Sequence, residues 1–376
     1  MKLVCIIFVA IASIVSINAV PTSKKLADSI SERTFTKAPV NVPIFNNGKV
    51  NPLYYAEIEI SKQKFNVCLD TGSADLWLPH PSCHDDIACM KKKSFDFTKS
   101  PTFSTKNKHF LDAYGFGNVS GIVATDDISM GGLTAQGQIF GLALHETYNY
   151  GESKFDGIMG MSLNRIYEPG YIGNLPLFNS LVQQKVVDEP IFSFYFGGKG
   201  GTHGQLTLGG YDSSLFEGSL HFNTLLYPDS GRWFTRFDDV AVNGTPLNFR
   251  NKMALLDTGA PIIIASDIDA KTVHSSIDGA LKISGRYFIP CNTTVAVSLQ
   301  FAGIDYNITL AAEPIKIDGL CSSSIQSPGG QENKRGDVFG DPNIWIVGVP
   351  FLKTVYATFD IANLRVGFAL PKTQAI

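Results

Sequence analysis

Charged side chains are scarce in this chain of 376 residues. Asp, Glu, Lys and Arg together make up 17%, against ~25% in an average globular protein, and the net charge is only −3. Without a surplus of basic residues, neither nucleic acid nor an anionic membrane is an expected partner. Glycine and phenylalanine are plentiful, with 35 and 26 copies. This composition favours a compact, turn-rich β protein, and the length suggests two to three folding units.

Long apolar runs are also missing, except at the N-terminus. There, Lys2 is followed by LVCIIFVAIASIVSI and then by Asn18 and Ala19. We predict a signal peptide over residues 1–19, cleaved after Ala19. The alternative is an N-terminal membrane anchor, which would need about 20 apolar residues. No other segment has the length to span a bilayer, so no membrane span is expected in the mature chain.

Cysteine is infrequent, with six copies, of which Cys5 leaves with the signal peptide. Because exported proteins pass through an oxidising compartment, the remaining cysteines are expected to pair where they can. We predict the disulfides Cys83–Cys89 and Cys291–Cys321. Cys68 is then the odd one, embedded in a strand pattern, and is predicted to be a free thiol.

The common signatures of metal and serine catalysis are absent. His80 and His84 lie beside Cys83 and Cys89, but their spacing matches no standard zinc pattern. Neither H-E-x-x-H nor G-x-S-x-G occurs, which disfavours a zinc peptidase and a serine hydrolase. We therefore predict no metal and no cofactor. Export also gives meaning to the N-x-[ST] sequons, which make candidate glycosylation sites of Asn118, Asn243, Asn292 and Asn307.

Helical periodicity is rare, and short alternating strands dominate. Only residues 174–187, behind a possible Asn174 cap, and the segment opened by the capping box Ser266–Asp269 predict helices. Strands are expected in many short runs separated by turn residues, among them 54–60, 138–144, 192–196 and 205–210. The predicted architecture is mainly β.

One phrase occurs twice in this strand-rich background. FNVCLDTGSADLW, residues 65–77, is answered by MALLDTGAPIIIA, residues 253–265. An aspartate at the end of an apolar strand costs burial free energy unless something holds it or uses it. In both halves the D-T-G triplet is followed further along the chain by two apolar residues and a glycine. This glycine is Gly160 in the first half and Gly348 in the second, and its distance from the triplet is almost the same in both. The repeated order indicates a duplicated chain.

A duplicated acid suggests a specific chemistry. If the halves pack with approximate two-fold symmetry, the two D-T-G loops meet at the axis and bring Asp70 and Asp257 face to face. Two carboxylates that close share one proton, because both cannot ionise cheaply. The ionised carboxylate is then a general base for a water molecule, and the protonated one donates to a carbonyl oxygen. This arrangement hydrolyses an amide without a metal.

At these residues the sequence resembles the pepsin-like aspartic proteases, from about residue 51 to residue 371. The resemblance implies a mainly β, bilobal fold of two pseudo-symmetric lobes, with a cleft between them and a few short helices. It implies that Asp70 and Asp257 are catalytic and that Thr71 and Thr258 hydrogen-bond across the pair. By the same likeness Ser73 supports the first aspartate, and Gly72 and Gly259 contact substrate.

Residues 113–121 resemble the family's flap, a hairpin that closes over the substrate. The likeness implies that Tyr114, Gly115 and Phe116 contact substrate, with Trp77 as the hydrogen-bonding neighbour of Tyr114. It also places Cys68 and Phe155 at the substrate pocket, although a buried, inert thiol is the alternative for Cys68. Three positions depart from the family: Phe116 stands where a small polar residue is usual, Ala260 replaces a hydroxyl residue, and Val349-Pro350 replaces an acid.

The sequence thus predicts four segments and a function. The segments are a signal peptide (1–19), a short prosegment (20–37) whose Lys24, Lys25, Arg33 and Lys37 pair with an acidic cleft, and lobes over 38–220 and 221–376. The alternative for 20–37 is a solvated tail. The expected function is an acid endopeptidase that cuts between bulky apolar residues in protein and peptide substrates and is inhibited by pepstatin-type compounds. A monomer, secreted or lysosomal, is expected. The alternative is a pepsin-like binding protein that has lost catalysis.

Overall fold

The computed structural model describes most of the chain after the predicted signal peptide. The described ranges are 37–46, 52–83, 87–115, 117–146, 154–166, 172–197, 203–314, 319–328 and 341–372. The predicted signal peptide and the predicted prosegment up to residue 36 lie outside these residues. Among the described helices, none has the length and apolarity needed to cross a membrane.

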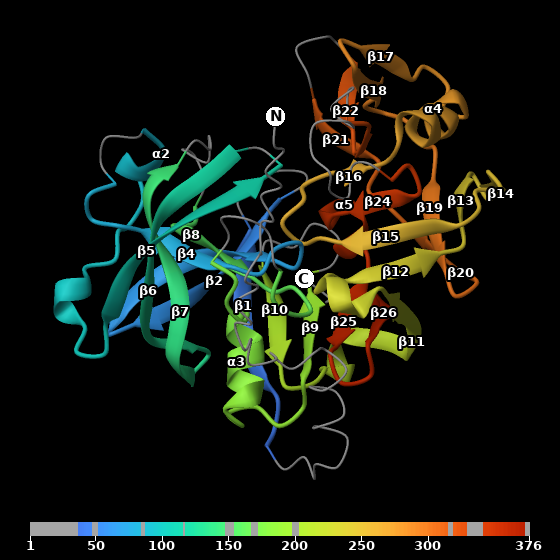
Figure 1. Ribbon diagram of the computed structural model, residues 1–376. Helices are drawn as coiled ribbons and strands as arrows, with labels where there is room; N and C mark the ends of the chain where they lie inside the picture. Colours follow the sequence, from blue (N-terminus) through green and yellow to red (C-terminus); the bar gives the residue numbers. More distant parts are fainter. Residues whose placement is uncertain are drawn as a thin grey trace, which may run out of the picture.

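The fold consists mainly of β-strands, as predicted, and forms two β-rich halves that lie side by side (Figure 1). The strands of the first half are β1 (Val40–Asn46), β2 (Tyr54–Ile60), β3 (Gln63–Asp70), β4 (Leu76–Pro79), β5 (Ser104–Tyr114), β6 (Gly117–Met130), β7 (Leu133–Glu146), β8 (Gly157–Gly160), β9 (Ile191–Tyr195) and β10 (His203–Leu208). The strands that follow are β11 (Phe216–Leu226), β12 (Phe234–Phe237), β13 (Asp239–Val242), β14 (Thr245–Pro246), β15 (Lys252–Leu256), β16 (Ile263–Ile264), β17 (Leu281–Ile283), β18 (Arg286–Pro290), β19 (Val297–Phe301), β20 (Ile304–Asn307), β21 (Ala311–Pro314), β22 (Leu320–Ser323), β23 (Ile325–Gln326), β24 (Ile344–Val347), β25 (Tyr356–Asp360) and β26 (Arg365–Pro371). The helices are short: α2 (Ile87–Met90), α3 (Leu177–Gln183), α4 (Asp267–Ser275), α5 (Val349–Leu352) and the 3-10 turns η1 (Phe97–Lys99), η2 (Ser213–Leu215) and η3 (Pro228–Ser230).

Both halves contain the same three-strand motif. β3 runs parallel to β8, and β4 runs antiparallel to β8 on its other side. In the second half β15 runs parallel to β24, and β16 runs antiparallel to β24. The glycine that ends each apolar pair is required by close packing, since a methyl group on Gly160 would lie 2.2 Å from the carbonyl carbon of Ala74, and one on Gly348 would lie 2.2 Å from the Ala260 oxygen. The repeat read from the sequence is therefore a repeat of tertiary structure.

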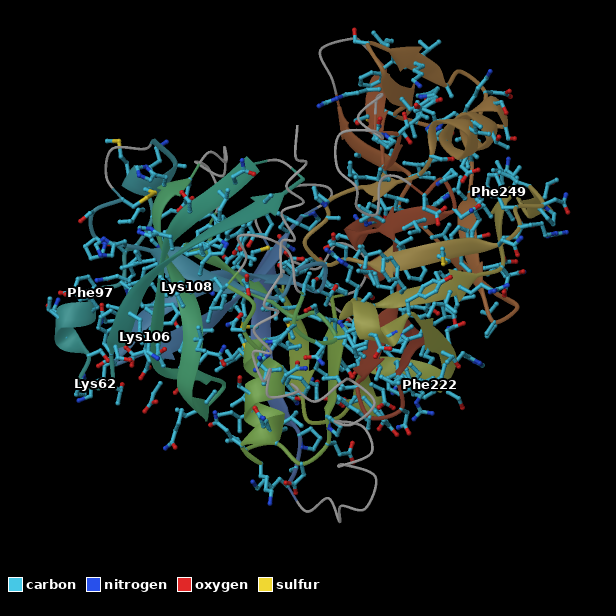
Figure 2. All side chains as sticks on the ribbon, in the orientation of Figure 1. Lys62, Phe97, Lys106, Lys108, Phe222 and Phe249 are labelled. Carbon is cyan, nitrogen blue, oxygen red and sulfur yellow. A yellow bond between two sulfur atoms is a disulfide. The ribbon has the colours of Figure 1, made fainter. Side chains whose placement is uncertain are left out.

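A continuous sheet joins the halves behind these motifs. β9 pairs with β25, β25 with β26, and β26 with β11. Phe222 of β11, labelled in Figure 2, packs against Gly367 of β26, and the guanidinium carbon of Arg365 lies 3.8 Å from the centroid of its ring. The predicted lobe boundary at residues 220 and 221 falls within β11 and stays a prediction.

The two predicted helices form, but one predicted cap is wrong. Ser266 caps α4 as expected, because its hydroxyl accepts the Asp269 N–H at 3.2 Å. Helix α3 begins after Pro176, and its cap makes no side-chain hydrogen bond. Asn174 instead donates its amide to the Ile139 carbonyl in β7. The Asn174 side chain therefore makes a tertiary contact with β7 instead of the helix cap that the local sequence pattern predicts.

The cysteines pair as expected. Disulfides join Cys83 to Cys89 and Cys291 to Cys321, while Cys68 is a buried free thiol. The first disulfide joins Cys83 to Cys89 of α2, and the second ties β22 to the residue that follows β18. Each bridge therefore lies within one half of the molecule and leaves the contact between the halves to hydrogen bonds and packing.

Candidate active site

The two D-T-G loops are locked together through their threonines. The Thr71 N–H donates to Thr258 Oγ1, and the Thr258 N–H donates to Thr71 Oγ1, both at 3.0 Å. The Thr71 hydroxyl donates to the Leu256 carbonyl at 2.8 Å, and the Thr258 hydroxyl donates to the Leu69 carbonyl at 2.7 Å. Both threonines are fully buried, so each lost partner would cost about 1–3 kcal/mol. The loops are consequently rigid relative to one another.

This cross-link brings two carboxyl groups into contact. The side chains of Asp70 and Asp257 hydrogen-bond each other. Both carboxyls lie next to Gly259. A methyl group placed on this glycine would lie 2.5 Å from Oδ1 of Asp70 and 3.2 Å from Oδ1 of Asp257, so the two oxygens are close to each other. Asp70 is only 6% exposed. A hydrogen bond between two carboxyls requires one proton, so the pair binds a proton as a unit.

The supports of the two carboxyls differ. Oδ1 of Asp70 accepts the Gly72 N–H at 2.9 Å, and Oδ2 accepts the Ser73 hydroxyl at 2.5 Å. Oδ1 of Asp257 accepts the Gly259 N–H at 2.8 Å. The position equivalent to Ser73 is Ala260, whose methyl group packs in an apolar cluster with Phe234, Leu255 and Ile346. Asp257 therefore lacks the hydroxyl donor that Asp70 has.

The surroundings favour the protonated form of Asp257. Burial raises the pKa of Asp257 well above its ordinary value, and the charge of Asp70 and the hydrogen bond with it raise the pKa further. The Gly259 N–H and the positive charge of Arg232 act in the opposite direction. Arg232 lies at the same loops, since its Nη1 donates to the Gly72 carbonyl at 3.1 Å. Two neighbouring acids that share a proton in this way are suited to act as general base and general acid.

Comparison with known proteins agrees with this geometry. The family model described as eukaryotic aspartyl protease matches residues 53–371. The chain belongs to this family. Cathepsin D of Gallus gallus is 32% identical over 335 residues, covering 84% of this chain and 80% of the relative. Cathepsin E of Oryctolagus cuniculus is 32% identical over 347 residues (88% and 82%), and a probable vacuolar protease A of Arthroderma benhamiae is 30% identical over 333 residues (86% and 80%). The protein is therefore an aspartic endopeptidase.

The hairpin of β5 and β6 carries the segment that resembles the protease flap. Tyr114 ends β5 and pairs with Gly117, the first residue of β6. Trp77 of β4 donates its indole N–H to the Tyr114 hydroxyl at 2.9 Å, as the resemblance implies. A methyl group on Gly115 would meet nothing within 4 Å, so the tip leaves open space at this residue. Phe116 lies outside the described residues.

Cys68 and Phe155 lie in the apolar cluster beside this hairpin. The cluster also contains Trp77, Phe110 and Ile158, with Tyr114 packed against it. Cys68 is 2% exposed and Phe155 is 1% exposed. Burial raises the pKa of the Cys68 thiol well above its ordinary value, and the charges of Asp70 and Asp257 raise it further. The thiol is therefore protonated and close to the two D-T-G loops.

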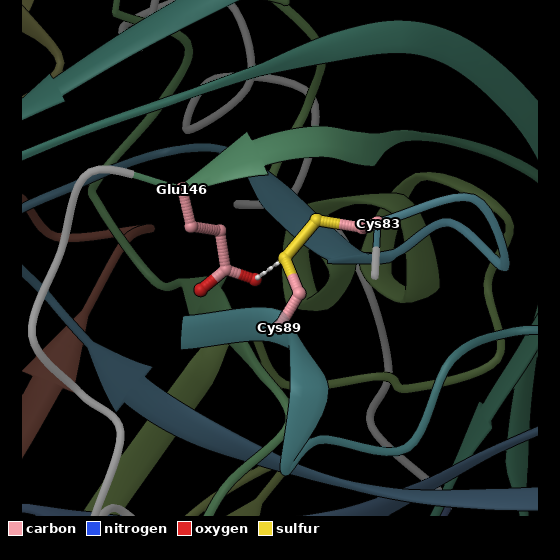
Figure 3. Close-up of side chains that lie close together, drawn as sticks. All are labelled: Cys83, Cys89 and Glu146. Carbon is pink, nitrogen blue, oxygen red and sulfur yellow. Dashed lines mark hydrogen bonds between the residues drawn. A yellow bond between two sulfur atoms is a disulfide. The ribbon is translucent and has the colours of Figure 1, made fainter. Parts of the chain in front are cut away.

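Lys92 and Glu146 form a buried ion pair that the sequence analysis did not predict, and Lys92 packs over the Trp77 ring. Lys92 Nζ lies 2.5 Å from Glu146 Oε2 and 5.2 Å from the centroid of the Trp77 ring. The other carboxylate oxygen, Oε1, lies 3.5 Å from Sγ of Cys89 (Figure 3). Cys83, Cys89 and Glu146 are the group with metal-ligand spacing among the described residues. Because the two sulfurs are bonded to each other and Glu146 binds Lys92, the group has no thiolate for a metal ion.

Lys37 is the one residue of the predicted basic prosegment that the structure describes. Its backbone N–H donates to Asp188 Oδ2 at 3.0 Å, and its Nζ donates to the Lys185 carbonyl at 2.5 Å. These contacts lie just beyond α3. Lys37 is therefore engaged there, and pairing of the other three basic residues with the cleft stays a prediction.

Proposed function

We propose that Asp70 and Asp257 activate one water molecule for attack on a peptide carbonyl. In this proposal the ionised carboxylate takes the proton of the water, and the protonated carboxyl donates to the carbonyl oxygen. The observation that carries it is the hydrogen-bonded carboxyl pair held between two threonine-locked loops. The raised pKa of Asp257 supports work in acid, where the pair keeps its proton.

We propose further that the substrate lies under the flap, residues 113–121, with bulky apolar side chains on both sides of the cut bond. The apolar cluster of Cys68, Trp77, Phe155 and Tyr114 supports an apolar pocket next to Asp70. Gly72 and Gly259 would present their backbone to the peptide, since each lies against the carboxyl of the opposite loop, where a methyl group would clash. Gly115 and Phe116 would cover it from the flap.

The proposal extends to the lobe boundaries, the oligomeric state, the inhibitors and the localisation of the enzyme. The lobes would span 38–220 and 221–376, and the enzyme would act as a monomer that pepstatin-type inhibitors block. The predicted signal peptide and the two disulfides support delivery to the outside of the cell or to a lysosomal or vacuolar compartment. Asn243, Asn292 and Asn307 are exposed and open to glycosylation, whereas Asn118 is half-buried in β6.

The test is cleavage of denatured globin by the processed protein at pH values from 3 to 7, with and without pepstatin. We expect cleavage in acid that pepstatin abolishes and product ends rich in bulky apolar residues. No pepstatin-sensitive cleavage by protein whose N-terminus has been verified would favour a binding protein that has lost catalysis.

Ala260→Thr is expected to move the alkaline limb of the kcat/KM profile to lower pH. The new hydroxyl would donate to the charged form of Asp257 and so lower the pKa of the pair. A charge-assisted hydrogen bond contributes about 1.5–3 kcal/mol, and one pKa unit is about 1.4 kcal/mol, so a shift of several tenths to about one pH unit is expected. Ala260→Val is the matched control, because it has the shape of threonine without the hydroxyl. A limb that stays in place, or that moves equally in both variants, would contradict the expected effect.

A further inference from the structure

A second pair of buried acids lies beside the flap, apart from the catalytic aspartates. Asp75 precedes β4, and Asp112 belongs to β5; each side chain is only 2% exposed. The Ile172 N–H donates to Oδ2 of Asp75 at 2.9 Å. The two side chains also hydrogen-bond each other. Buried acids of this kind are costly unless they are held in place, which suggests that the pair has a task.

The pair is one of two matching links between β5 and the start of β4. Asp75 binds Asp112, and two residues further along both segments Trp77 binds Tyr114. Side chains two positions apart on a strand point to the same face. Asp112 and Tyr114 therefore reach from the same face of β5 towards the loop that carries Asp70. One link is a neutral indole–phenol hydrogen bond, and the other needs a proton.

The hydrogen bond between Asp75 and Asp112 needs a proton. Among the described residues, no N–H or hydroxyl reaches Oδ1 of Asp75. A hydrogen bond between two carboxyl groups contains one proton, so the hydrogen bond between Asp75 and Asp112 requires that one of them is protonated. Burial raises the pKa of Asp75 to about 6, against opposing hydrogen bonds from Asp112 and from the backbone N–H groups of residues 172–174. Asp75 is the first of the two acids to ionise, because the hydrogen bond from Asp112 stabilises its charged form. The pair therefore keeps the shared proton throughout the acid range and loses it only above the pH at which Asp75 ionises.

We propose that Asp75 and Asp112 are positioning residues that fasten the flap to the active-site loop through one shared proton. Loss of this proton leaves two carboxylates face to face, releases β5 and weakens substrate binding. The proposal rests on the proposed function, because it assumes that Tyr114 covers a substrate held at Asp70 and Asp257.

Four other ionisable groups near the pair, all among the residues that the structure describes, are engaged elsewhere or neutral. Burial raises the pKa of Tyr114 well above its ordinary value, and the charges of Asp112, Asp70 and Asp75 raise it further, so the phenol stays neutral. Glu146, which lies two strands away in the register of β5, β6 and β7, is paired with Lys92. The Cys68 thiol is held protonated. Asp70 shares a proton with Asp257 and accepts the Ser73 hydroxyl.

The test is the pH dependence of KM and kcat for a peptide substrate between pH 4 and pH 7.5. Asp112→Leu removes the link, so below pH 6 its KM should be about tenfold above the wild-type KM, the change that loss of one ordinary hydrogen bond produces, while kcat changes less. Above pH 6 the wild type loses the same link, and the two KM values should converge. Asp112→Asn replaces the titrating proton with an amide N–H. The ratio of the wild-type KM to the Asp112→Asn KM should therefore grow above pH 6. Asp305→Asn, at an exposed acid of β20, is the matched control and should follow the wild type.

Three outcomes decide the proposal. A wild-type KM for Asp112→Leu below pH 6, or a constant KM ratio between wild type and Asp112→Asn across the pH range, would overturn it. If Asp112→Leu does not fold, Asp112→Asn and its reciprocal Asp75→Asn carry the test, since either amide can bridge to the remaining acid. Absence of pepstatin-sensitive cleavage by the wild-type enzyme would instead refute the proposed function, so the two failures are distinguishable.

Discussion

Replacing either aspartate of the proposed catalytic pair, by Asp70→Asn or Asp257→Asn, is expected to lower kcat by at least about 10³-fold while the fold persists. General acid–base catalysis contributes about 10²–10⁴-fold, and an amide cannot take a proton from water or share one with the other carboxyl. The threonine cross-link does not depend on either carboxyl, so the loops should keep their positions. The measurement is kcat with a peptide substrate, together with circular dichroism of each variant.

Deamidation is the main risk in this experiment, because it would regenerate aspartate from asparagine. Asp70→Ala and Asp257→Ala are the matched controls, since alanine cannot revert. Near-wild-type turnover by any of these four variants, with the mass of the protein verified, would refute the assignment of the pair. Loss of activity together with loss of structure would require the milder asparagine variants to be compared at lower temperature.

The pH dependence of stability provides an independent readout of the same pair. The pKa of Asp257 is raised in the folded state, so folding favours its protonated form. Ionisation of Asp257 therefore lowers the free energy of unfolding. This loss is absent below the pKa that Asp257 has in the unfolded chain, and it grows as pH rises towards its pKa in the folded protein. Asp257→Asn removes this loss. The variant should therefore lose less thermal stability than the wild type between pH 4 and pH 7.

Short-range patterns were sufficient for most of the fold and for the catalytic loops. β2 occupies the predicted residues 54–60, because alternation of buried and exposed residues is a local property. The two D-T-G loops are visible because each contains its whole motif within a few residues. The apolar pair before Gly160 and before Gly348 was visible for the same reason, and the parallel pairing of β3 with β8 and of β15 with β24 explains why both were needed.

Contacts between distant segments could not be read in this way. Asp75, Asp112 and the Lys92–Glu146 ion pair come from separate strands and loops, and only tertiary packing brings them together. A weak signal was present at Asp112, because Phe110, Leu111 and Asp112 alternate and Leu111 is the exposed member. That alternation places an acid on the buried face of β5. Asn174 shows the reverse error, in which a local cap pattern lost to a contact with β7.

Gly72→Ala is expected to lower kcat by about 100-fold or more without unfolding the protein. The new methyl group would lie 2.5 Å from Cγ of Asp257 and 2.6 Å from each of its carboxylate oxygens, closer than any real contact. The Thr71–Thr258 cross-link prevents the backbone from giving way, so the Asp257 carboxyl must turn out of line with Asp70. A displacement of about 1 Å at a reacting group can cost 10²-fold in rate. Gly115→Ala is the comparison variant, because its methyl group would meet nothing within 4 Å, and it should change kcat by only a few fold. Thermal unfolding of Gly72→Ala should stay close to that of the wild type, since a side-chain end moves rather than the core. Equal kcat values for Gly72→Ala and the wild type would show that the two carboxyls need not stand in contact for catalysis.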